Sequence, residues 1–164
     1  AGLQQHYHVY AALERALETT PTLEGVYRQD QSRLEHVRAD LTFFGAEPNA
    51  ELLEASNAII ALFNRFAAED PLALLGAFYV FEGSRLGSSV LYLHLSRALD
   101  VDPAPGNGLD MHMGGLATLG RDFKRLLEIL ERFAEDDEQT EAIVAGAEST
   151  FRALRDLYAA LPAD

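Results

Sequence analysis

The sequence predicts an all-α fold, a compact helical bundle that forms a single domain over residues 1–164. Apolar residues recur every three to four positions through most of the chain, which is the spacing of one helix face. Proline, glycine and capping residues separate these segments, and no segment shows the alternation that is typical of a strand. With 164 residues, of which 48% are hydrophobic, the chain has enough apolar material for one core.

The N-terminal half of the chain predicts three helices. The first has an apolar face from Leu3 to Leu17, and the turn at Thr20-Pro21 ends it. The second runs from Leu34 to Phe44 and closes at Gly45, a suitable C-cap residue. We expect Asn49 to cap a third helix. Its apolar residues are Leu52, Leu53, Ile59, Ile60, Leu62, Phe63 and Phe66.

The C-terminal half predicts three more helices. The fourth runs from Pro71 to about Leu99, and Asp70 is its expected N-cap. Residues 100–115 hold two prolines and four glycines and predict one long loop. A fifth helix follows, with an apolar side formed by Leu119, Phe123, Leu126, Leu130 and Phe133. Asp136 with Gln139 resembles a capping box for the last helix. The expected inward face of this last helix carries Val144, Ala147, Phe151, Leu154, Tyr158 and Leu161.

Composition excludes several classes of protein. The chain has no cysteine, so disulfides, thiolate metal sites and a cysteine nucleophile are absent. Its net charge of -13 opposes binding to nucleic acid. No apolar run is long enough to span a membrane, and the first residues, AGLQQHYHVY, lack the features of a secretory signal. We therefore expect a cytoplasmic protein that binds neither nucleic acid nor a membrane.

Three glycines inside the fourth predicted helix are the most informative local feature. Gly83 and Gly87 follow Gly76 by seven and eleven residues, and at about 100° per residue all three fall on one face. An interior glycine costs a helix about 1 kcal/mol relative to alanine, so its presence needs a reason. Either another helix packs very close to this bare backbone, or a large flat ligand lies directly on it.

Familiar catalytic motifs are scarce elsewhere in the sequence. No glycine-rich loop follows a strand, so the usual nucleotide sites are unsupported. None of the five histidines has an acidic residue three or four positions before it, which disfavours a di-iron carboxylate site. The bare helix face among residues rich in Phe, Tyr and Leu suits a planar apolar ligand that brings its own chemistry.

The segment EGSRLG, followed by SSVLYLHLSRALD, resembles the distal helix of bacterial haem oxygenases. The segments HYHVYAALERAL, TLEGVYRQDQSRLEHVRADLTFFG, GLDMHMGGLATLGRDFKRLLEIL and AESTFRALRDLYAAL are similar to other helices and loops of that family, so the resemblance covers essentially the whole chain. It implies a helical fold that binds haem as both substrate and cofactor, with no other metal. It also implies cleavage to biliverdin, CO and iron with electrons from a reductase or a ferredoxin. The alternative is a non-catalytic module of the same fold that binds a tetrapyrrole or a protein partner.

The resemblance also implies roles for individual residues. Gly83 and Gly87 match the distal glycines that let the helix backbone approach the haem, and Ser84 occupies the polar position beside them. These three are the expected catalytic-site residues. The expected haem-contacting residues are Tyr10, Phe78, Gly83, Gly87, Ser88, Lys124, Phe151 and Tyr158, with Tyr10 supporting a distal water network and Lys124 pairing with a propionate.

The iron ligand has no match in this sequence. In the family, the proximal histidine lies in a helix upstream of the one that HYHVYAALERAL resembles, and the given sequence begins there. Either residues upstream of Ala1 supply the ligand, or this member has lost it. Leu93 stands where some members place a lysine, and His94 falls on the glycine face. We expect structural or solvent-facing roles for His6, His8 and His36, and we assign no role to His112.

Overall fold

The computed structural model describes residues 2–48 and 51–162, and these ranges contain helices and no strand. The all-α prediction is therefore confirmed. The α-helices are α1 (Gly2–Thr19), α2 (Leu34–Phe43), α3 (Glu54–Glu69), α4 (Pro71–Leu99), α5 (Asp110–Met113), α6 (Leu119–Phe133) and α7 (Asp137–Ala160). Two short 3-10 turns, η1 (Pro21–Leu23) and η2 (Gln29–Gln31), connect α1 to α2.

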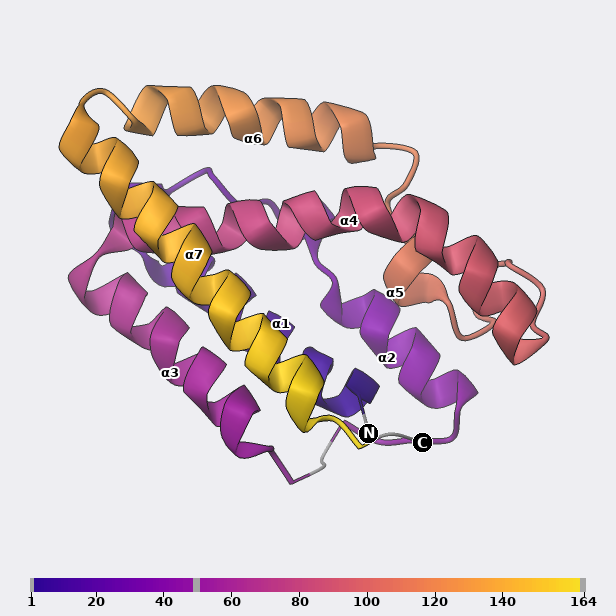
Figure 1. Cartoon of the computed structure of the whole chain (residues 1–164). Coiled ribbons are helices and arrows are strands. Elements are labelled where there is room, and N and C mark those ends of the chain that lie inside the picture. The colour runs from indigo at the N-terminus through magenta and orange to yellow at the C-terminus, as the bar shows by residue number, and fades with distance from the viewer. Residues whose placement is uncertain (1, 49–50, 163–164) are drawn as a thin grey trace.

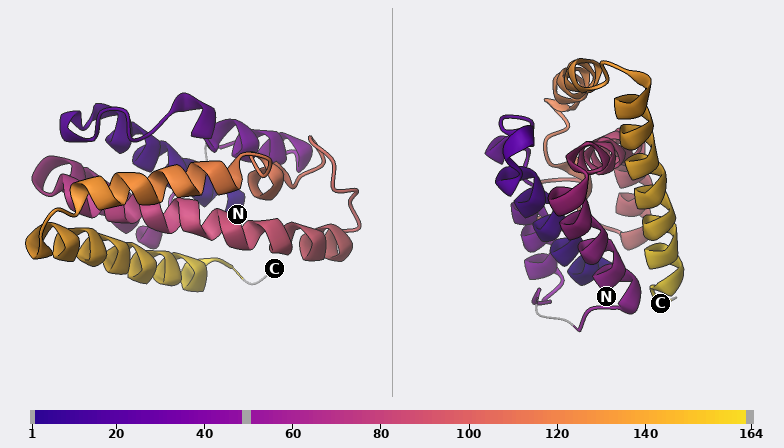
Figure 2. Two further views of the ribbon diagram at one scale, coloured as in Figure 1. Left: turned by 90° about the horizontal axis from the view of Figure 1, so that it is seen from above. Right: turned by 90° about the vertical axis from the view of Figure 1, so that its left-hand side faces the viewer.

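The long helix α4 is the centre of the bundle. It contacts α1, α3, α5, α6 and α7, and its most extensive interface is with α7. Figure 1 shows α7 crossing α4 near the start of both helices and then running away from it beside α3. Figure 2 shows α6 on the outer side of α4, away from α1 and α3. The face of α4 between α6 and the diverging end of α7 is therefore covered by no other described helix.

The core surrounds the first half of α4. Leu74, Leu75 and Ala77 are fully buried there, and they pack among apolar residues of α1 and α3 such as Leu17 and Phe63. The second half of α4 leaves this core, because Val90 is 61% exposed. Leu91, Leu93 and Leu99 are also exposed. Figure 1 shows α4 bending as it passes α5 and leaves the bundle.

Three predicted helix ends are confirmed, and each depends on residues close in sequence. The Asp70 carboxylate accepts a hydrogen bond from the N–H of Ala73 at 3.2 Å, as expected for the N-cap of α4. Asp136 caps α7 in the same way through the N–H of Gln139, at 2.8 Å. Gly45 follows α2 with φ +63°, the left-handed conformation that glycine adopts most easily.

The predicted start of α3 was wrong. Asn49 lies outside the described residues, and Leu52 and Leu53 precede the helix, which begins at Glu54. The cause is a side chain of α1: the Gln5 Oε1 atom accepts the N–H of Leu53 at 3.0 Å, and its Nε2 atom donates to the carbonyl of Glu51 at 3.0 Å. These two bonds keep the residues before Glu54 outside the helix.

The predicted loop over 100–115 contains the short helix α5. The buried Asp40 carboxylate of α2 accepts the N–H groups of Asp110 at 2.6 Å and of Met111 at 2.8 Å. It thus acts as an N-terminal cap supplied from 70 residues away. Burial raises the pKa of Asp40, and these two backbone hydrogen bonds oppose that shift.

The inward face of α7 also differs from the prediction. Its buried residues are Ile143, Gly146, Thr150 and Leu157. Phe151 and Tyr158 were expected inside but are 59% and 57% exposed, and Val144 is 50% exposed. Gly146 lies where α7 crosses α4, because the two backbones are too close there for a side chain. Thr150 satisfies its hydroxyl internally by donating to the carbonyl of Gly146 at 2.8 Å.

Candidate functional site

The helix crossing of α4 and α7 depends on two glycines. A Cβ atom placed on Gly76 would lie 2.0 Å from the Ile143 carbonyl oxygen, and one on Gly146 would lie 2.1 Å from the Ala73 carbonyl oxygen. Neither position has room for a methyl group, because the obstructing atoms belong to the backbone. For Gly76, the first of the two alternatives from the sequence is therefore correct.

Gly83 and Gly87 have different surroundings. A Cβ atom on Gly83 would meet only the Phe123 ring at 3.8 Å, an ordinary contact, and one on Gly87 would meet nothing within 4 Å. No described helix packs closely enough on these residues to require glycine. We call this surface, formed by Gly83 and Gly87 of α4, the glycine face. Its backbone is open to a ligand.

Apolar side chains flank the glycine face. Phe123 of α6 lies beside it and packs against Tyr79 of α4, with 6.0 Å between the ring centroids. One turn before Gly83, a hollow of about 380 Å³ lies between α4, α6 and α7. Its lining is mostly apolar and consists of Tyr79, Leu130, Ile143, Val144, Ala147, Glu148 and Phe151. Phe123 therefore gives the glycine face an aromatic neighbour from α6, and the hollow adds apolar surface one turn earlier along α4.

Two of the predicted ligand contacts are buried in the core. Tyr10 packs edge-on against Phe81, with ring centroids 5.2 Å apart, and burial raises the pKa of Tyr10 to about 12. Phe78 packs against Tyr27 with 6.3 Å between ring centroids. The structure thus places both residues among the core side chains, away from the open surface of α4, and their contact with a ligand stays a prediction.

The two predicted serines have hydrogen-bond partners within the fold. The exposed Ser84 donates its hydroxyl to the Phe81 carbonyl of the same helix at 2.7 Å. Ser88 Oγ lies 3.3 Å from Nδ1 of His112 in α5. Ser84 is therefore a polar group beside Gly83 whose hydroxyl proton is directed to a backbone carbonyl.

Lys124 and Tyr158 complete the predicted set. The Lys124 side chain is 80% exposed, and its Nζ atom lies 3.9 Å from Glu128, an ion pair too exposed to fix its position. Tyr158 is the partner of His6, whose Nε2 atom lies 3.1 Å from the phenol oxygen. Gly83 and Gly87 thus lie on an open stretch of α4 and Phe151 is exposed on α7, whereas Lys124 is held in place by no strong contact.

The histidines offer no prepared metal site. His6 Nδ1 lies 2.9 Å from the Gly2 carbonyl and therefore donates to it, so its Nε2 atom accepts the hydroxyl of Tyr158. His8 contacts the Pro48 carbonyl at 2.5 Å. His94 is exposed on α4, seven residues after Gly87. Within the described ranges, no group of three or more His, Cys, Asp or Glu residues could hold a metal ion.

Sequence reasoning missed a buried charged cluster beneath this part of α4. Glu82 and Arg85 form an ion pair, with 2.7 Å between Oε2 and Nη1, and both side chains are buried. Arg33 is buried as well and donates to the Gly114 carbonyl, and the buried Asp40 accepts the N–H of Met111 in the same segment. The three-residue spacing of Glu82 and Arg85 could have predicted this ion pair, because residues three apart are neighbours on a helix. Arg33 gave no such signal because its partners are 78 and 81 residues away.

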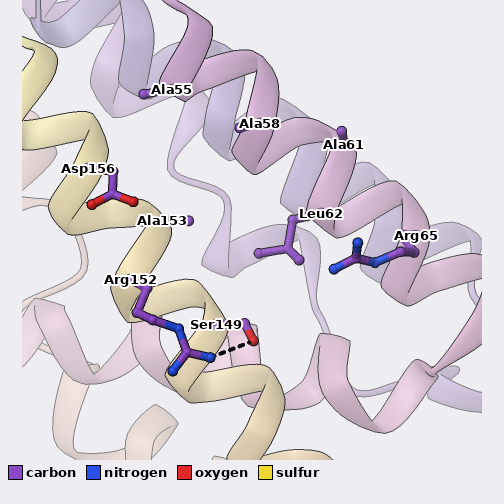
Figure 3. A pocket seen from close by; sticks show the side chains of 9 residues that line it. All are labelled: Ala55, Ala58, Ala61, Leu62, Arg65, Ser149, Arg152, Ala153 and Asp156. Carbon is purple, nitrogen blue, oxygen red and sulfur yellow. Dashed lines mark hydrogen bonds between the residues drawn. The ribbon is translucent and has the colours of Figure 1, made fainter.

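A second hollow lies elsewhere, in the groove between α3 and α7. It has a volume of about 580 Å³, and none of the predicted site residues lines it. Figure 3 shows Ala55, Ala58 and Ala61 along α3, facing the groove across from α7, with Arg152 donating to Ser149 at 3.3 Å. The hollow is larger than the one beside the glycine face, but the charged residues that line it, Arg65, Arg152 and Asp156, are exposed.

Comparison with known proteins identifies the class and then the family. A sequence model described as heme oxygenase matches residues 2–160, so the chain belongs to the haem oxygenase family. The fold is similar to that of heme oxygenase from Leptospira interrogans, with a TM-score of 0.83 and 22% identity over 98% of this chain and 81% of that one. A comparison with curated protein sequences gives no match.

Two cyanobacterial structures share the fold as well. Heme oxygenase-2 from Synechocystis sp. PCC 6803, in complex with heme and NO, has a TM-score of 0.77 and 24% identity over 94% of this chain and 67% of that one. Heme oxygenase-1 from the same organism, in complex with heme, gives 0.74 and 19% over 93% and 71%. The family assignment agrees with the resemblance seen in EGSRLG.

None of the helices in the described part of the chain combines the length and the apolar character that crossing a bilayer needs.

Proposed function

We propose that this protein binds haem on the glycine face and cleaves it oxidatively to biliverdin, CO and iron, with electrons from an external reductase or ferredoxin. The observation that carries the proposal is the open backbone at Gly83 and Gly87, in a chain of the haem oxygenase family. Each glycine costs helix stability, and no packing contact of the described residues explains either one.

The residues around the glycine face fit a flat apolar ring. The missing side chains at Gly83 and Gly87 allow a planar ligand to reach the α4 backbone, Phe123 provides an apolar flank, and the exposed ring of Phe151 lines the hollow one turn earlier. When bound, haem supplies the iron that activates O2. The role of the chain is then to orient the ring and to keep strong acids and bases away from it. Ser84 meets this need because its hydroxyl donates to the backbone.

A titration of the protein with haemin tests the proposal. We expect a Soret band that saturates at one haemin per chain, and we expect added ascorbate to replace it with biliverdin absorption. Gly87→Leu places a side chain over the face and should abolish the band. Gly120→Leu is the matched control, because Gly120 lies in α6 and its Cβ would also meet nothing within 4 Å.

The results separate three outcomes. The proposal fails if the wild-type protein gives no saturable Soret band, or if Gly87→Leu binds haemin as the wild type does. A band that persists after ascorbate supports the alternative, a module that binds a tetrapyrrole without cleaving it. The alternative has one supporting observation, since both ring nitrogens of the buried His6 are already hydrogen bonded.

A further inference from the structure

Two charged residues of the EGSRLG segment have no part in the function proposed above. Glu82 and Arg85 are both buried, although they belong to a helix with an exposed side nearby. Their ion pair is 2.7 Å long and spans one helical turn around Gly83 and Ser84. Burial of two charges is costly even when they pair, and apolar residues of similar volume often stabilise a fold as well or better. The pair therefore needs an explanation other than core stability.

Arg85 also connects α4 to the segment that follows α5. Its Nη2 atom donates to the Gly115 carbonyl at 3.4 Å, and a Cβ atom on Gly115 would lie 2.5 Å from that nitrogen. Gly115 has φ +72°, so a side chain there would be strained as well. The chain at residue 115 is thus shaped to receive this guanidinium group.

A second buried guanidinium group holds the same segment from α2. Arg33 donates through Nη1 to the Gly114 carbonyl at 2.6 Å and through Nη2 to the Met111 carbonyl. Asp40 binds the N–H groups at the other end of the segment. Residues 110–115 therefore form a crosspiece that α2 fixes and that Arg85 joins to α4. We call it the α5 crosspiece.

The glycine face needs such support. Gly83 and Gly87 each weaken α4, and the helix loses its core contacts over the same stretch. Figure 1 shows that α5 lies against α4 where α4 bends out of the bundle. The α5 crosspiece therefore supports α4 on the side of Arg85, while the glycine face of α4 stays open.

We propose that Glu82 and Arg85 are positioning residues that fix the α4 backbone at Gly83 and Gly87 against the α5 crosspiece, so that the glycine face is already formed before a ligand binds. Glu82 orients the guanidinium group of Arg85, and Arg85 makes the connection to Gly115. The link from this rigidity to haem affinity rests on the proposed function. The rigidity itself does not.

Hydrogen exchange of the ligand-free protein tests the positioning role directly. The double variant E82L/R85M replaces the pair with apolar residues of similar size. We expect amides 83–88 to exchange at least about tenfold faster, the factor that corresponds to losing one hydrogen bond to a charged group, while the global unfolding transition stays in place. The matched control is R155M/D156L, which removes an exposed pair of α7 at 3.0 Å and should leave amides 83–88 unchanged.

Arg85→Lys provides a second variant that keeps the buried charge. Its single nitrogen can pair with Glu82 but cannot also reach Gly115, so exchange should be faster than in the wild type and slower than in E82L/R85M. Haemin affinity should fall in the same order. Unchanged exchange of amides 83–88 in E82L/R85M would overturn the positioning role. Faster exchange with unchanged haemin affinity would overturn the link to binding, and a wild type that binds no haemin counts against the proposed function alone.

Discussion

The glycines of α4 predict opposite effects of the same substitution at two positions. Gly76→Ala places a Cβ 2.0 Å from the Ile143 carbonyl oxygen, where an ordinary contact starts at 3.4 Å, so α4 and α7 must separate by more than 1 Å. Overpacking of this kind costs roughly 3 kcal/mol, and the better helix propensity of alanine returns about 1 kcal/mol. Gly87→Ala should gain the helix propensity of alanine without the overpacking cost, because its Cβ meets nothing within 4 Å.

The expected result is a destabilisation of about 2 kcal/mol for Gly76→Ala and a stabilisation of up to about 1 kcal/mol for Gly87→Ala. In a chain of this length, these values correspond to a Tm lower by roughly 4–8 °C and a Tm higher by roughly 2–4 °C. Urea and thermal unfolding of the ligand-free variants measure both. Gly120→Ala reports the propensity term alone. A Gly87→Ala variant that is less stable than the wild type would refute the conclusion that Gly87 has no packing role.

Three further predictions concern side chains around the site. Burial lowers the pKa of His6 below 6.5, so the folded state disfavours its charged form. The neutral His6 side chain therefore contributes fully to folding stability above pH 6.5, and this contribution is lost as the pH falls below that value. Urea unfolding should show the stability difference between the wild type and His6→Gln shrinking by at most about 1.4 kcal/mol per pH unit. Asp40→Ala leaves two N–H groups of α5 without an acceptor, and we expect a loss of about 2 kcal/mol, with faster hydrogen exchange at residues 110–113. Lys124→Met should change stability by less than about 0.5 kcal/mol, because the side chain is 80% exposed. A lower haemin affinity of Lys124→Met would support its predicted contact with a propionate, and an unchanged affinity would contradict it.

The sequence predicts a helix end well when the end is determined locally. Asp70 and Asp136 cap helices that start within three residues of them, and both caps are confirmed. The start of α3 and the existence of α5 depend instead on Gln5 and Asp40, which lie 48 and 70 residues from the N–H groups they bind. No local pattern contains this information, because the partner is defined only after the chain has folded.

The spacing of the three glycines in α4 did not distinguish their purposes. Gly76, Gly83 and Gly87 were predicted on one face, and the sequence allowed either a close helix crossing or a ligand. The structure shows that Gly76 lies in the crossing with α7, whereas a Cβ on Gly83 or Gly87 would meet no atom of α7 within 4 Å. The position of a crossing along a helix depends on the path of the second helix, and the glycine spacing of α4 does not describe that path.

The error in the inward face of α7 has the same origin and bears on the site. The prediction placed the largest apolar residues inside, but the crossing needs Gly146, whose Cβ would lie 2.1 Å from the Ala73 carbonyl oxygen. With Gly146 turned toward α4, the helix period places Phe151 on an exposed side. This ring lines the apolar hollow beside the glycine face. The close packing at one end of α4 therefore leaves an aromatic side chain of α7 uncovered in this hollow, and its contact with haem stays a prediction.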